Sequence, residues 1–168
     1  ATFDDGLCEY DGDYSLDIPV YAYGEIETAA FDSDLTGSLT FYAKIHSAGT
    51  HYLFTGGKVQ EGLAFIVDTN VGSVGIQQLY AYSAPSQSFT GDIININQWH
   101  HFTFVSNGIG TPYEVYVNGV KLNNGAIIDP DQSYLEGAWF GNVGGNSSAW
   151  IGKARDGSLY LNGTVDDI

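Results

Sequence analysis

Cysteine is nearly absent from this chain of 168 residues, which contains only Cys8 and no methionine. A single cysteine cannot form an internal disulfide, so a fold held together by a framework of bridges is excluded. We interpret Cys8 as a small buried hydrophobic residue, with an intermolecular bridge or a reactive thiol as the alternative. A chain of this length can instead bury roughly 70 % of its unfolded surface in one core, which predicts a single domain over residues 1–168.

Basic residues are also scarce, because 5 Lys and Arg face 20 Asp and Glu, for a formal net charge of -15. Nucleic-acid binding needs cations that neutralise phosphates, so DNA and RNA are excluded as partners. The acidity is explained either by solubility in a salty medium or by carboxylates that bind cations. No apolar run reaches the roughly 18 residues of a membrane-spanning helix.

The usual patterns of catalytic and zinc sites are missing. The four histidines form no HxxxH or Cys/His cluster, and neither a nucleophile elbow nor a phosphate-cradling glycine loop is found. His100 and His101 adjoin each other on an expected strand, where neighbouring side chains point to opposite faces. The sequence therefore predicts a protein that is not an enzyme.

Alternating apolar and polar residues are present throughout, with 22 glycines but only 4 prolines for the turns. Residues 100–105 and 113–117 read as two half-buried strands, and Asn118-Gly119 then predicts a type I′ hairpin turn. Further strands are expected in residues 38–45, 51–57, 62–68 and 74–83, with an extended run at 14–23 and an approach to the hairpin at 88–98. Short strands without a helical period predict an all-β fold, an antiparallel β-sandwich.

Two segments of this pattern are irregular. Pro19 interrupts the run at 14–23 and cannot donate to a strand ladder, so it indicates a sheet edge or a bulge. A brief helical turn would fit residues 29–35. After Asn123 the alternation weakens, and we expect a long excursion with one or two short strands, which is the region where function is most often found.

Three segments carry a family resemblance, in the right order along the chain. They are YDGDYSLDIP at residues 10–19, INQWHHFTFVSNGIGTPYEVYVNGVKL at 96–122, and IGKARDGSLYLNGTVDDI at 151–168. The chain resembles the laminin G-like, concanavalin A-like lectin/glucanase superfamily, which implies a jelly-roll sandwich with Trp99 as a structural core residue. Relatives usually continue past the Asp-Asp pair, so the last strand is expected to be short or to be completed from outside the chain.

The resemblance implies a calcium site between the opening strand and the closing aspartates. By matched position its ligands are Asp11, Asp13 and Asp166, and strand alternation would turn Asp166 outward while its neighbour packs in the core. Asp129 and Asp131 on the long excursion are a second candidate pair. The alternative for all of these is an ordinary solvated turn, since aspartate is a common turn former.

Glucanases of the superfamily need two opposed carboxylates on an acidic strand of the form Glu-x-Asp-x-(x)-Glu. The closest segment is Glu25-Ile26-Glu27, which lacks the third acid. The Arg plus Gln-x-His pattern of lyases with this fold is absent as well. The resemblance therefore implies the binding branch of the superfamily rather than the enzymes.

Sugar recognition by this architecture uses aromatic platforms, which stack on the apolar face of a pyranose, and polar groups that orient it. Packing within the sheets is the alternative for each aromatic residue. We also consider Trp150 as a platform and Gln78 as a polar partner. The candidate sugar-binding residues are Tyr80, Tyr82, Tyr134, Trp139, Asn142 and Asn146.

These observations predict a non-catalytic, calcium-stabilised module for carbohydrate binding or adhesion, whose partner is a glycan or another extracellular surface ligand. Because Ala1 stands where a removed leader would have ended, we expect a secreted or surface-displayed protein. The alternative is a structural subunit or decoration protein of an extracellular filament, surface layer or virus particle that assembles with its neighbours.

Overall fold

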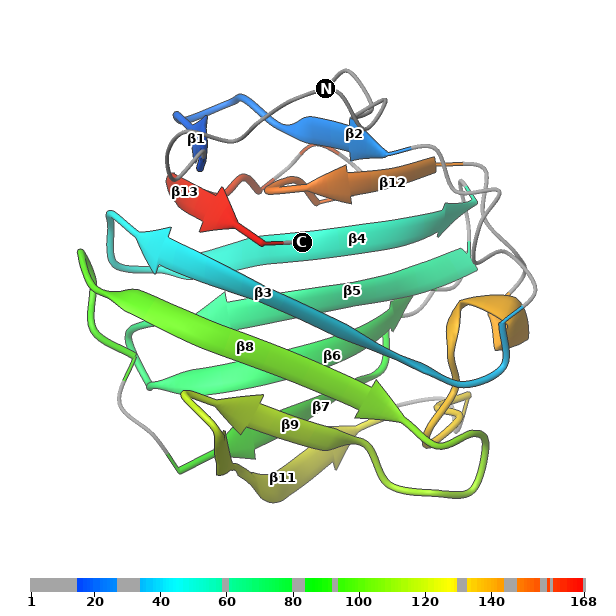
Figure 1. Ribbon diagram of the computed structural model, residues 1–168. Coiled ribbons are helices and arrows are strands. Elements are labelled where there is room, and N and C mark those ends of the chain that lie inside the picture. The colour runs from blue at the N-terminus through cyan, green and yellow to red at the C-terminus, as the bar shows by residue number, and fades with distance from the viewer. Residues whose placement is uncertain are drawn as a thin grey trace, which may run out of the picture.

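The computed structural model describes residues 15–26, 34–58, 61–79, 84–91, 94–129, 133–143, 148–154, 157 and 159–167. Its strands form two antiparallel sheets that lie face to face, with β3 and β8 in front of β4, β5 and β6 in Figure 1. The predicted all-β sandwich is confirmed. Within the described residues no helix is both long and apolar enough to cross a membrane.

The first sheet has six strands in the order β1-β13-β3-β8-β9-β10. Their bounds are Leu16–Ile18, Gly163–Asp166, Gly37–Ile45, Trp99–Ser106, Glu114–Val117 and Val120–Lys121. The second sheet has seven strands in the order β11-β7-β6-β5-β4-β12-β2. Their bounds are Asn123–Ile128, Ser86–Thr90, Ser73–Leu79, Glu61–Asp68, Thr50–Lys58, Ser148–Ile151 and Gly24–Ile26.

Local turn chemistry agrees with the expected elements. Asn118 and Gly119 join β9 to β10 with positive φ values of 52° and 78°, as a type I′ turn requires. Pro19 directly follows β1, which is an edge strand of the six-stranded sheet, so the predicted edge position is confirmed. The excursion after Asn123 contains β11, the 3-10 helix Phe140–Asn142 and β12, which agrees with the expectation of one or two short strands.

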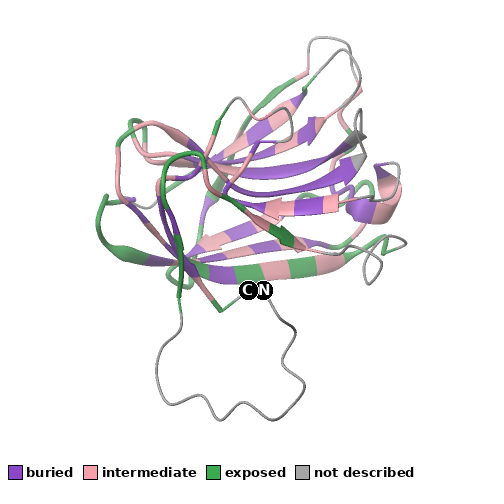
Figure 2. Ribbon diagram, turned by 90° about the horizontal axis from the view of Figure 1, so that it is seen from above, coloured by how far each residue is buried: buried purple, intermediate pink, exposed green. Residues whose placement is uncertain are grey.

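The core lies between the sheets and is built by strand alternation, visible as buried and more exposed residues taking turns along the strands in Figure 2. In β8, His100, Phe102 and Phe104 are buried, while Trp99, His101 and Thr103 lie on the outer face. Trp99 is 42 % exposed, so the expectation that it is a core residue is wrong. The alternation that starts at His100 places it outside.

A buried imidazole holds a specific position in this core. His51 lies in β4 and is almost fully buried. Burial lowers the pKa of the His51 imidazole below its usual value, although a hydrogen bond with the Ser47 carbonyl opposes this effect. His51 therefore stays neutral inside the protein at neutral pH.

Candidate functional site

Three residues predicted to bind sugar close one end of the sandwich. The Tyr134 hydroxyl donates to Oε1 of Gln87 at 3.0 Å, and burial raises the pKa of Tyr134. The Asn142 side chain accepts a hydrogen bond from the Trp139 backbone N–H at 2.8 Å. Trp139 itself is 4 % exposed and packs in the core across Gly37, so it offers no open platform and we leave it out of the candidate site.

The three other predicted sugar-binding residues, Tyr80, Tyr82 and Asn146, lie outside the described residues. Cys8 and most of the expected helical turn at 29–35 lie outside them as well. For these positions the interpretations from the sequence stay predictions.

Of the predicted calcium ligands, only Asp166 belongs to the described residues, since Asp11 and Asp13 do not. Its neighbour Val165 is 1 % exposed and packs in the core, while Asp166 lies on the outer face and accepts the N–H of Asp167 at 3.0 Å. In the described part of the chain, no three His, Cys, Asp or Glu side chains group as metal ligands would. Calcium binding stays a prediction.

Asp129, from the second candidate pair, already closes a turn. Its two carboxylate oxygens accept the backbone N–H groups of Ser133 and Tyr134 at 2.8 and 3.0 Å. Asp131 lies outside the described residues. The observed role of Asp129 is therefore to anchor the loop that closes the end of the sandwich.

We expect added Ca²⁺ to raise the melting temperature and EDTA to reverse the rise, because an ion that binds only the folded state stabilises it by about 2.7 kcal/mol at 100 times its Kd. Asp166→Asn should abolish the rise, whereas Asp129→Asn should keep it while lowering the starting value. Differential scanning calorimetry with and without Ca²⁺ measures both variants. A rise that survives Asp166→Asn, or equal melting with Ca²⁺ and EDTA, would count against the predicted site.

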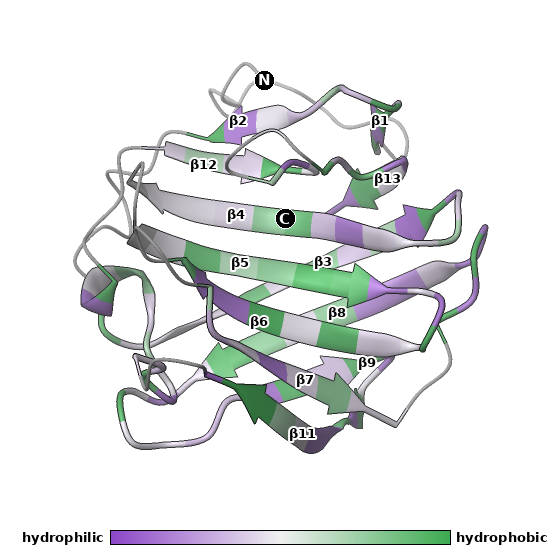
Figure 3. Ribbon diagram, turned by 180° about the vertical axis from the view of Figure 1, so that it is seen from behind, coloured by the Kyte–Doolittle hydropathy of each residue, from purple (hydrophilic) through white to green (hydrophobic). Residues whose placement is uncertain are grey.

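Figure 3 shows the seven-stranded sheet from its outer side, with β4, β5, β6 and β7 next to one another. Strand register places polar and aromatic residues from five of its strands on this face. The same register forms one row of neighbouring residues that crosses β2, β12, β4, β5, β6 and β7. In that strand order, the row consists of Glu25, Trp150, Thr55, Ala64, Gln77 and Ser86. Glu25, Trp150, Gln77 and Ser86 are at least partly exposed there and supply a carboxylate, an indole, an amide and a hydroxyl, whereas Thr55 and Ala64 are fully buried.

A hollow of about 270 Å³ lies beside this row, where Gly75 has no side chain and Ile66 leans across it. Its rim carries the hydroxyls of Thr50, Ser73, Ser86 and Ser88 and the carboxylate of Asp68. Asp68 is held in place by the Thr50 hydroxyl, which donates to it at 2.9 Å. Glycine inside a strand often marks close approach by another group.

Side chains in the middle of the face, and at the end that carries Trp150, are also held in specific positions. The Tyr52 hydroxyl donates to Oε1 of Gln77 at 2.8 Å. Next to Trp150, Thr55 is 0 % exposed, and in the described part of the structure its hydroxyl has no hydrogen-bond partner. A buried hydroxyl without a partner is unusual. We define the sheet face as the row Glu25, Trp150, Thr55, Ala64, Gln77 and Ser86, together with Tyr52 and the residues that line the hollow beside Asp68.

The other sheet also exposes aromatic residues, and several of its outer polar groups bond one another, as they do on the sheet face. The Thr40 hydroxyl lies 2.8 Å from Nε2 of His101, whose ring is tilted by 41° against that of Tyr42, with 4.6 Å between the ring centres. At the edge, the Tyr116 hydroxyl and Lys121 both bond Glu114, and they lower the pKa of its carboxyl group.

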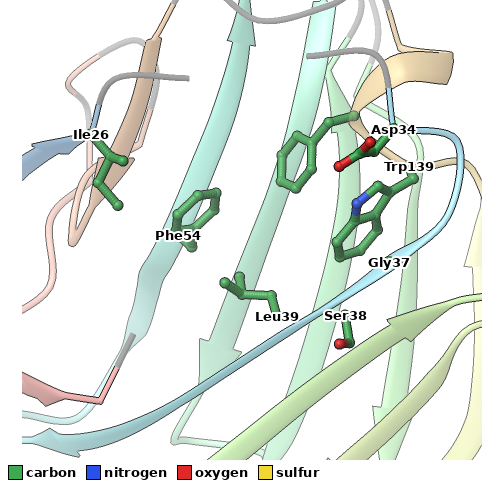
Figure 4. Close-up of a pocket in the computed structure, with 8 residues that line it drawn as sticks. Ile26, Asp34, Gly37, Ser38, Leu39, Phe54 and Trp139 are labelled. Carbon is green, nitrogen blue, oxygen red and sulfur yellow. The ribbon is translucent and has the colours of Figure 1, made fainter. Parts of the chain in front are cut away.

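A cavity of about 320 Å³ opens between the sheets at the end that Trp139 closes (Figure 4). Phe54, Leu39 and Trp139 form its apolar walls, with Asp34 on its rim. Ile26 and Asp34 flank residues 27–33, which lie outside the described residues. The described residues therefore define this cavity less completely than they define the sheet face.

The fold and the sheet face define a jelly-roll sandwich of the lectin type. A family model described as the concanavalin A-like lectin/glucanases superfamily matches residues 20–168, and the chain belongs to this superfamily. The resemblance seen in the three sequence segments is thereby confirmed. Among curated proteins, no sequence matches the chain.

Three solved structures are similar to this chain in fold. The CBM40 of the Ruminococcus gnavus IT-sialidase, bound to α2,3-sialyllactose, has a TM-score of 0.62 at 14 % identity over 86 % of both chains. The SAP-like pentraxin of Limulus polyphemus has 0.58 at 16 %, over 95 % of this chain and 70 % of that one. Domain 4 of the Geobacillus stearothermophilus arabinanase AbnA, in complex with arabinotriose, has 0.57 at 16 %, over 94 % and 74 %. At these identities the likeness establishes the fold.

Most side chains of the sheet face are not predicted by the sequence as binding residues. Trp150 is predicted as a possible platform, whereas Tyr52, Asp68 and Gln77 are predicted only as parts of strands. The available signal was the combination of strand alternation with glycine at position 75. Alternation predicts which residues face outward, but only the strand order brings β4, β6 and β12 to the same surface.

Proposed function

We propose that this protein is a non-catalytic carbohydrate-binding module that holds a glycan on the sheet face. The observation that carries the proposal is the row of outward side chains that joins Trp150 to the hydroxyl-lined hollow beside Asp68. An indole stacks on the apolar face of a sugar ring, while hydroxyl, amide and carboxylate groups bond its hydroxyls.

The positions of two acids on this face support binding rather than hydrolysis. Glu25 lies on β2 and Asp68 on β5, three strand spacings apart in the sheet order, which is roughly 14 Å at about 4.8 Å a strand. Glycoside hydrolases hold their two carboxylates within about 5 to 9.5 Å. This pair is too far apart for that chemistry.

Glycan-bound relatives of the fold add further support. The Ruminococcus module is bound to sialyllactose and the Geobacillus domain to arabinotriose. The latter belongs to an extracellular arabinanase, and our proposal includes an extracellular location. Because a fold does not determine a function, the argument depends on the sheet face and not on the likeness alone.

Trp150→Ala is expected to weaken glycan binding at least tenfold, since a tryptophan that anchors a ligand contributes about 2 kcal/mol or more and about 1.4 kcal/mol is a factor of ten. A glycan array with the wild-type protein selects the ligand, and isothermal titration with that ligand measures the change in Kd.

Trp99→Ala is the matched control, because it removes the same side chain from the outer face of the other sheet. Its Kd should stay within about twofold of wild type, a difference below 0.5 kcal/mol. A loss confined to Trp99→Ala would move the site to the six-stranded sheet. A wild-type protein that retains no glycan would refute the proposed function.

A further inference from the structure

Lys153 occupies an unusual position at the β2 edge of the sheet face. Its ammonium nitrogen lies 3.8 Å from the ring centre of Tyr23 and 5.5 Å from that of Trp150. Gly24 and Ile151 pair in register at positions that face the core. Their chain neighbours Tyr23 and Trp150 therefore point outward, on either side of this pair. The two rings therefore fix a positive charge on the surface where the glycan is proposed to bind.

In the described part of the chain this lysine forms no salt bridge, although the charge balance of the sequence would lead one to expect one. Acids outnumber Lys and Arg by 20 to 5, and Lys121 pairs with Glu114 at 2.9 Å. Within the described residues, no carboxylate comes within ion-pair distance of Lys153. Its ammonium group thus keeps hydrogen-bond donors available for a ligand.

Aromatic rings continue from Lys153 towards the sandwich edge. Lys153 forms a β-bridge with Tyr160, whose ring meets Tyr21 edge-on at 5.5 Å. Tyr21 and Tyr23 are 78 % and 44 % exposed. Exposed aromatic rings therefore surround the lysine. A charged sugar needs both groups, because its ring makes apolar contacts with an aromatic ring and its carboxylate binds a cation.

We propose that Lys153, Tyr23 and Trp150 form a subsite for a carboxylate-bearing sugar residue within the glycan. The inference rests on the proposed function and adds the class of ligand. The sugar ring stacks on the indole, and its carboxylate accepts a charge-assisted hydrogen bond from the lysine. Glu25 pairs with Trp150 in register and carries a negative charge on the same face. The carboxylate therefore binds on the Tyr23 side of the indole, away from Glu25.

The test compares acidic probes with matched neutral ones by isothermal titration. One pair is an oligogalacturonate and its methyl ester, and the other is 3′-sialyllactose and lactose, so that uronic and sialic acids are distinguished. For at least one pair, the wild-type protein should bind the acidic member about tenfold more tightly. This preference should decrease as NaCl is raised, because salt screens exposed charges.

Lys153→Met should remove the preference by weakening the binding of the acidic probe, whereas Lys153→Arg should keep it. Lys121→Met, on the other sheet, is the matched control and should behave as wild type. Glu25→Gln should strengthen the binding of the acidic probe by about twofold or more, as removal of a nearby like charge predicts. Circular dichroism melting verifies that each variant is folded.

The outcomes separate this inference from the function on which it rests. Equal binding of the acidic and neutral probes, or a preference that survives Lys153→Met, overturns the acidic subsite and leaves the carbohydrate-binding function intact. If the wild-type protein binds no probe and no glycan on the array, both proposals are refuted.

Discussion

Phe65→Ala is expected to lower the free energy of unfolding by about 3 to 5 kcal/mol, the usual cost of removing a buried phenylalanine ring. Phe65 lies near the centre of β5 and is 0 % exposed. Its ring is 4.4 Å from that of Phe104 on the facing sheet and 5.9 Å from that of Trp139. The substitution therefore opens a cavity where both layers and the closing loop meet.

Urea denaturation measures this loss, with Tyr42→Ala as the matched control. Tyr42 is also a strand aromatic residue but is 41 % exposed on the outer face, where it contacts His101. Its removal should cost at most about 1 kcal/mol, the range of cross-strand surface pairs. Equal losses in the two variants would contradict the assignment of Phe65 to the shared core.

Most strands were predictable because their signal is local. The alternation of Phe41, Ala43 and Ile45, or of Phe102 and Phe104, is written into neighbouring residues, and the Asn-Gly turn needs only two. Glycine and proline positions marked the ends of several strands in the same way. The order of the strands within each sheet depends on distant pairs, such as β1 with β13, and the family resemblance implies the jelly-roll architecture without giving that order.

The candidate site was harder to predict, because neither segment character nor family resemblance fixes the direction of a single side chain. Trp139 lies in a glycine-rich loop and is predicted to bind sugar, yet it packs in the core because Gly37 leaves room for its ring. The family resemblance implies a core position for Trp99, although its place in the strand alternation is outside. The contact of Lys153 with Tyr23 joins opposite ends of the chain, and no local pattern reveals it.

Gln78→Leu is expected to be the second severe substitution, with a loss of roughly 2 to 4 kcal/mol in the free energy of unfolding. Gln78 points inward from β6 and is 0 % exposed. Its amide donates to the Leu135 carbonyl at 2.6 Å, and its carbonyl accepts the Leu135 N–H at 2.8 Å. Leucine has a similar size but leaves both backbone groups without this partner, at about 1 to 3 kcal/mol for each buried group.

The neighbouring Gln77→Leu provides a matched control on the same strand. Gln77 faces outward and is only partly buried, so its replacement should cost less than about 1 kcal/mol even though it removes the bond from Tyr52. Hydrogen exchange should be faster in residues 133–143 for Gln78→Leu and unchanged there for Gln77→Leu, because of the two glutamines it is Gln78 that bonds the backbone of that loop. An equal loss in the free energy of unfolding for the two variants would contradict the assignment of Gln78 to the inner face of β6 and of Gln77 to its outer face. Gln77 could then no longer belong to the sheet face.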